Sequence, residues 1–125
     1  MANPNIVNVA AIYGNTSTTA LSSTSATSIV SNASGSGKVY RINSLIVSNV
    51  DGTNAADITI NIYSAASLGG TAFAVASTIS VPADASLIII DKTTGIYLLE
   101  DKSIGAIAGA ANDLVVTCSW EEINA

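Results

Sequence analysis

The sequence of 125 residues contains no histidine, and only 10% of its residues are charged, against roughly 25% in an average globular domain. Histidine is the side chain that most often acts as a general base or metal ligand near neutral pH. No Gly-x-Ser-x-Gly or Ser-x-x-Lys motif is present that would activate a serine nucleophile. The sequence therefore predicts a protein that is not an enzyme and that uses no cofactor.

Cysteine is nearly absent as well. Cys118 is the only one, so an intrachain disulfide is excluded, and it lies in a run of alternating apolar residues at 114–120. A single cysteine in such a pattern is typical of a buried, unreactive thiol, with an interchain bridge or a nucleophile as the alternatives.

Basic residues are few and scattered. The net charge is −5, and the four cations are Lys38, Arg41, Lys92 and Lys102. Because each neutralised phosphate needs a Lys or Arg, nucleic-acid binding is not expected. The longest run of large apolar residues is 87–90, far below the 18 or so that span a bilayer. The N-terminus has no signal-peptide pattern, so we expect synthesis in a cytosol and no membrane partner.

What the sequence does contain is alternation with a period of two. At 57–63, Ile58, Ile60 and Ile62 share one face of a predicted strand, and residues 114–121 alternate in the same way. Further strand-like runs, separated by Gly, Asn, Asp and Pro turns, occur at 6–13, 27–31, 39–50, 72–81, 87–91, 95–99 and 104–108. The Ser/Thr/Ala tract at 17–28 is interpreted as a strand pair or one long exposed strand.

Eight or nine short strands with regular spacing predict an all-β protein, an antiparallel two-sheet β-sandwich of the jelly-roll kind. The length fits a single domain over 1–125, in which residues 1–5, with Pro4 opposing regular strand pairing, form an N-terminal arm. Sparse surface charge also favours self-association.

Two features offer alternative sites. The loop 51–57 carries Asp51, Asn54 and Asp57, which is ordinary turn chemistry between strands, with a bound calcium ion as the alternative. Trp120 is in phase with the apolar residues of its strand, so core packing is favoured over an exposed sugar-binding platform.

The run Leu87-Ile88-Ile89-Ile90 has two apolar faces. As a regular strand it carries Ile88 and Ile90 on the face opposite Leu87. Either both faces are covered within the sandwich, or the outer pair is an assembly surface. We take Ile88 and Ile90, with Pro4, Asn5 and Ile6 of the arm, as the candidate assembly interface.

Several segments carry a resemblance. These segments are Val81-Pro82-Ala83 before an apolar strand, 96–104, 110–116, the ending Ser119-Trp120-Glu121-Glu122, 2–7, 12–14 and 49–57. With them, the sequence resembles small virion structural proteins of tailed bacteriophages, particularly cyanophage-like ones. Those proteins typically have Gly where Asp101 stands, so no functional residue is transferred through that turn.

The resemblance implies a β-sandwich subunit of the virion that is made in the host cytoplasm. Its leading implied role is a capsid decoration (cement) protein on the capsid surface, as a homotrimer bound to the major capsid protein. The alternative is a neck, tail or fibre subunit that contacts host glycans. A secreted host adhesin is a third possibility, which the absent signal peptide disfavours.

Overall fold

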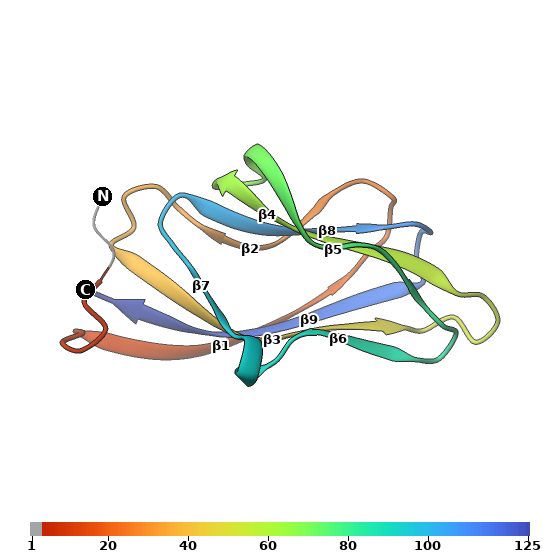
Figure 1. Cartoon of the computed structure of the whole chain (residues 1–125), viewed down its shortest axis with the longest axis horizontal. Coiled ribbons are helices and arrows are strands. Elements are labelled where there is room, and N and C mark those ends of the chain that lie inside the picture. Colours follow the sequence, from red (N-terminus) through yellow and green to blue (C-terminus); the bar gives the residue numbers. More distant parts are fainter. Residues whose placement is uncertain (1–3) are drawn as a thin grey trace.

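The computed structural model describes residues 4–125, which form nine β-strands and no α-helix. The strands are β1 (Ala11–Ala20), β2 (Thr27–Asn32), β3 (Lys38–Asn49), β4 (Ala56–Ala65), β5 (Gly69–Val81), β6 (Ser86–Ile90), β7 (Ile96–Leu98), β8 (Lys102–Ala108) and β9 (Leu114–Asn124), with a 3-10 turn η1 (Lys92–Thr94) between β6 and β7. Two antiparallel sheets lie face to face, so the predicted β-sandwich is confirmed (Figure 1). Within residues 4–125, no helix is long and apolar enough to cross a bilayer.

The strands pair as one long hairpin that has been rolled up. β1 pairs with β9, β2 with β8, β3 with both β6 and β7, and β4 with β5. Rolling this hairpin places β1-β9-β3-β6 in one sheet, with β7 also on β3, and β2-β8-β4-β5 in the other. This is the connectivity of a jelly roll.

The core lies between the two sheets and is aliphatic. Ile58 and Ile60 of β4 are fully buried, as are Leu45 and Val47 of β3, and all four belong to one continuous cluster. Fully burying each such side chain stabilises the fold by about 1.5–3 kcal/mol relative to leaving it in water. The apolar face predicted for 57–63 is therefore the face with which β4 packs against the opposite sheet.

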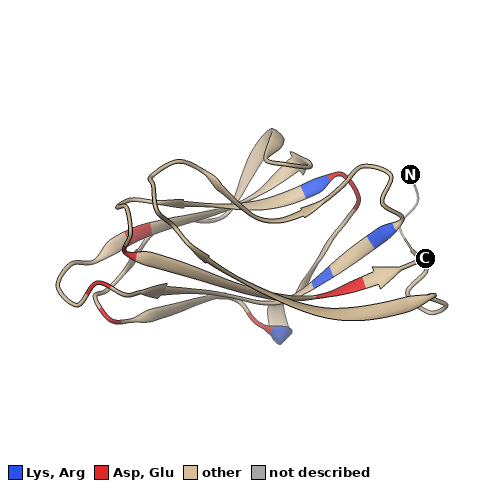
Figure 2. Ribbon diagram, turned by 180° about the vertical axis from the view of Figure 1, so that it is seen from behind, with Lys and Arg blue, Asp and Glu red and all other residues tan. Residues whose placement is uncertain are grey.

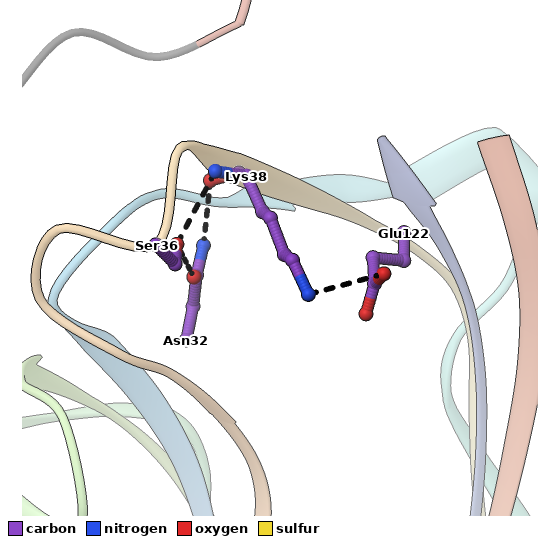
Figure 3. A network of polar contacts seen from close by, with 4 residues as sticks. All are labelled: Asn32, Ser36, Lys38 and Glu122. Atoms are coloured by element: carbon purple, nitrogen blue, oxygen red, sulfur yellow. Dashed lines mark hydrogen bonds and ion pairs between the residues drawn. The ribbon is translucent and has the colours of Figure 1, made fainter. Parts of the chain in front are cut away.

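Two buried asparagines tie the sheets together where the chain crosses between them. Asn32, at the end of β2, donates from Nδ2 to the main-chain carbonyls of Lys38 (2.9 Å) and Leu98 (3.1 Å) in the other sheet. Its Oδ1 accepts a hydrogen bond from Ser36, and Lys38 also forms an ion pair with Glu122 at 3.3 Å (Figure 3). The β2–β3 crossing is thus fixed by hydrogen bonds from a buried amide to main-chain carbonyls of the other sheet.

The first strand begins later than the sequence pattern indicated. The apolar run 6–13 was expected to be a strand, but β1 spans Ala11–Ala20 and takes in the first part of the Ser/Thr tract. Residues 22–26 form the exposed loop before β2. The tract 17–28 therefore supplies the end of one strand and the start of the next, but these two strands lie in different sheets and do not pair with each other.

Candidate assembly interface

The predicted outward pair on β6 is separated by a β-bulge. Ile88 is 61% exposed and lies opposite Ile46 of β3, whereas Ile90 is only 2% exposed and lies opposite Leu45. Leu45 and Ile46 are adjacent in β3, but their partners in β6 are separated by one extra residue, Ile89. The alternation of inward and outward side chains along β6 is therefore interrupted at Ile89. The prediction that Ile90 shares the outward face of Ile88 is wrong: Ile90 belongs to the core and Ile88 alone faces outward.

Pro4, in the described part of the predicted arm, and Ile6, just after the arm, lie against the outer face of the sheet that contains β1. Residues 1–3 of the arm are outside the described residues. Pro4 is buried and, with the 52% exposed Ile6, lines a shallow apolar hollow of about 220 Å³. The other lining residues are Val39, Tyr97 and Leu99. Asn5 is exposed, and its side-chain carbonyl accepts a hydrogen bond from the Val7 N–H at 3.0 Å, which turns the chain.

A polar band lies beside this hollow on the same outer face. Arg41 donates to the side-chain oxygen of Asn43 at 3.2 Å and to the hydroxyl of Tyr97 at 3.3 Å, and its guanidinium carbon lies 5.7 Å from the Tyr97 ring centroid. Asn43 in turn donates to Glu121 at 3.0 Å. These contacts hold the Tyr97 ring as a wall of the hollow.

The structure therefore does not gather the predicted interface into one patch. Ile88 is opposite Ile46, seven residues along β3 from the hollow residue Val39. At about 3.3 Å per residue, that separation is roughly 20 Å. Pro4 and Ile6 form one apolar surface and Ile88 a second one.

The thiol of the chain is enclosed, and its one indole packs against the core. Cys118 is fully buried in the core, and burial raises the pKa of its thiol to about 12. Trp120 packs against the core cluster, with its ring centroid 6.2 Å from that of Tyr40. Burial also raises the pKa of Tyr40. Core packing of Trp120 thus agrees with its phase in the sequence.

The loop 51–57 has the geometry of a turn. The Asp51 carboxylate accepts hydrogen bonds from the Thr53 N–H at 2.9 Å and from the Asn54 amide at 3.4 Å, and the Thr53 bond is the main reason why its pKa is lowered. Throughout residues 4–125, no group of three or more His, Cys, Asp or Glu side chains is placed to hold a metal ion. Turn formation accounts for these residues.

Charged residues avoid the edges of both sheets. The edge strands are β1 and β6 with β7 in one sheet, and β2 and β5 in the other. The four basic and nine acidic residues of the chain all lie in loops, turns and the inner strands β3, β4, β8 and β9, so none lies in an edge strand of the part that the structure describes (Figure 2). Edge strand β5 also exposes Phe73, Val75 and Ile79. The sparse charge is visible in the sequence, whereas its confinement to loops, turns and inner strands depends on the strand order.

Comparison with known proteins finds similarity of fold. Neither a protein family nor a curated protein matches the sequence. A solved chain from Bacillus endospore appendages, described as a novel family of disulfide-linked pili, aligns over 90% of this chain and 88% of its own length, with a TM-score of 0.52 and 18% identity. A chain from the structure of infectious bursal disease virus Gx strain aligns over 90% of this chain and 42% of its own, at a TM-score of 0.28 and 12% identity. The first likeness shows a shared fold, and the second is too distant to support an inference.

Proposed function

We propose that the protein is a non-enzymatic structural subunit of a multi-copy assembly, and specifically a capsid decoration protein that binds the major capsid protein lattice of a tailed bacteriophage. The observation that carries this proposal is the absence of charge from the edge strands that the structure describes. Monomeric β proteins place Lys, other charges or Pro at sheet edges to prevent pairing with other chains. A subunit whose function is to pair with its neighbours has no need of that protection.

The exposed apolar residues support the same role. Ile88, Ile6 and Phe73 each have more than half of their surface in water and lie on different parts of the molecule. Burial of one such side chain contributes about 1 kcal/mol or more. Contacts of that size are weak singly, but a subunit that engages a repeating lattice at several points binds with much greater avidity.

The chemical groups agree with a structural role. The chain has no histidine, and its one thiol is buried with a raised pKa. The jelly roll with outward apolar residues is compatible with the virion resemblance, which supplies the specific role on the capsid surface and the trimeric state. Both of these remain predictions.

A fibre, neck or tail subunit is the second candidate. The observation that favours it is that both sheets have edge strands without charge. When two different edges pair head to tail and the rotation between copies does not close a ring, the copies form an open filament. The fold is also shared with a pilus protein. Because Cys118 is buried and is the only cysteine, a filament of this chain would be held together without disulfides in its folded form.

Binding to phage heads tests the decoration role. Expanded heads of a phage that encodes this chain, prepared without it, are mixed with purified protein and sedimented. We expect saturable co-sedimentation with a fixed number of copies per head, and a head that better resists heat or low salt. Ordered filaments formed by the protein alone, with no binding to heads, would instead support the fibre role. A monomer that neither self-associates nor binds heads would overturn both.

A further inference from the structure

The four edges differ in how well they could accept another strand. β5 pairs with β4 through three register shifts and contains Thr78 at a φ of +50°. β2 has six residues with one shift, and β6 has five residues with one shift. Bulges and short length are features that prevent edge-to-edge pairing. These three edges therefore offer another strand a shorter or less regular ladder, although they carry no charge.

β1 has neither kind of protection. Its ten residues pair with β9 in one unbroken register, from Ala11 opposite Asn124 to Ala20 opposite Val115. It contains no proline and no charged residue. β1 is thus a long, regular and uncharged edge, which is the form of edge expected to recruit another strand.

The direction of the open hydrogen-bonding groups can be assigned. Just beyond β1, the Leu21 N–H donates to the Leu114 carbonyl of β9 at 2.9 Å. In an antiparallel ladder, successive residues turn their N–H and C=O groups to opposite sides. Odd-numbered residues of β1 therefore bond to β9, and even-numbered ones, Thr16 and Thr18 among them, turn theirs toward the open edge.

We propose that two copies of this chain associate through β1, antiparallel to β1 of the partner about a two-fold axis, so that the β1-containing sheets of both copies become one continuous sheet. The occupant is a second copy because a matching strand must also be long, regular and uncharged, and among the described strands only β1 itself qualifies as a free edge of that kind. An isologous pairing of this type closes on itself as a dimer contact.

The side chains of β1 are compatible with this pairing. Thr16 and Thr18 are exposed, and the Thr16 hydroxyl already contacts the Ser119 hydroxyl of β9 at 3.3 Å on the same face. Pairs of Thr and Ser across neighbouring strands are favourable, whereas like charges opposite each other would repel. Because β1 is uncharged, the two-fold axis brings no like charges together. The pairing rests on the proposed function in one respect, the self-association of the subunit, and it takes a two-fold contact in place of the trimer that the resemblance implies.

Proline at the open edge is the sharpest test. Thr16→Pro with Thr18→Pro removes two N–H groups that point away from β9, so the intramolecular ladder keeps its bonds. The matched control is Thr16→Val with Thr18→Val, which retains both N–H groups and the branched shape. Molar mass is measured by light scattering and sedimentation equilibrium across concentrations, with circular dichroism as the check of folding. We expect dimerisation at least tenfold weaker in the proline variant and near wild type in the valine variant.

Other outcomes separate this inference from the proposed function. Should the proline variant unfold, Thr16→Lys with Thr18→Lys replaces it, because four ammonium groups would then meet across the axis. If the edge variants self-associate as well as the wild type does, for example as trimers, the β1 pairing is overturned and the structural role stands. A wild-type protein that stays monomeric but binds phage heads overturns the pairing alone. A monomer that binds nothing overturns both.

Discussion

Asn32 and Asn49 occupy equivalent positions at the two crossings that β3 makes between the sheets. Asn32 bonds to the carbonyls of Lys38 and Leu98, and Asn49 donates from Nδ2 to the carbonyls of Asn54 at 2.9 Å and Val81 at 3.0 Å. Both side chains are buried. Each side-chain amide therefore links the two sheets by hydrogen bonds at a point where the main chain passes from one sheet to the other.

Replacing either asparagine by leucine should destabilise the fold strongly. Asn32→Leu leaves two carbonyls without their donor, and each buried unpaired group costs about 1–3 kcal/mol. We expect a loss of roughly 2–4 kcal/mol in the free energy of unfolding for Asn32→Leu, and a similar loss for Asn49→Leu, from urea denaturation. Asn54→Ala, at an exposed position, is the control and should change the value by under about 0.5 kcal/mol. A small effect at both crossings would show that water replaces the amides.

The two isoleucines of β6 should respond very differently to the same substitution. Ile90→Ala removes core volume, and such changes cost about 2–5 kcal/mol. Ile88→Ala removes side-chain atoms that are mostly in water, so about 0.5 kcal/mol or less is expected. Ile88→Asp should likewise fold, with reduced assembly if this side chain lies at an interface. Thermal unfolding and light scattering measure the two effects separately, and equal destabilisation by both alanine variants would contradict the bulge.

The buried thiol should be inert and should limit stability in alkali. In the folded protein Cys118 should not react with a thiol reagent at pH 8, and it should react in full after denaturation. The folded pKa of about 12 lies above the ordinary value of 9.0. The stability that the protonated thiol contributes is therefore complete below pH 9 and is lost as the pH rises toward 12, by up to about 1.4 kcal/mol per pH unit.

Cys118→Ala is the control for this dependence. The variant should be less stable at pH 7 because it leaves a small cavity, but its stability should fall less steeply between pH 9 and 11 than that of the wild type. Identical slopes for the two proteins would assign the alkaline loss to other groups, such as Tyr40, whose pKa is also raised.

The 3-10 turn between β6 and β7 should depend on an ionised carboxylate. Asp91 accepts hydrogen bonds from the Thr93 hydroxyl at 2.6 Å and from the Thr93 and Thr94 N–H groups at 2.9 and 3.1 Å, which lower its pKa, the Thr93 hydroxyl most. Its contribution is present above the ordinary pKa of 3.8 and is lost as the pH falls below that value. Asp91→Ala should therefore lower the melting temperature at pH 7, and the difference should disappear near pH 2. A constant difference across this range would contradict the assignment.

Periodicity and turn residues were sufficient to predict the sandwich, because stretches of several strands, such as the first part of β4 and of β9, alternate between buried and more exposed residues. The run at 57–63 is the clearest example, and its apolar face packs in the core as expected. The order of the strands in each sheet came from the structure, whereas the choice of a jelly-roll kind of sandwich followed from strand number and spacing. These features depend on local sequence, so the sequence reveals them.

The candidate interface depended on features that alternation cannot show. The bulge at Ile89 has no Gly or Pro beside it, and it arises from how β6 meets β3. β1 was missed as an edge because its inward positions carry Asn15, Ser17 and Thr19, which give no apolar signal. Which strands are edges is a property of the tertiary arrangement, and the absence of charge there has meaning only once that order is known.

The rolled-hairpin order has a consequence for how the protein is made. Ala11 pairs with Asn124, so the strand that opens the sandwich has no partner until the last strand has left the ribosome. Pairings so distant in sequence are slow to form, because the loop must be closed before any contact is gained. During that delay both sides of β1 are open, and a strand from another nascent chain can occupy the place of β9. Among the strands of its sheet, β1 is therefore the one that waits longest for its partner.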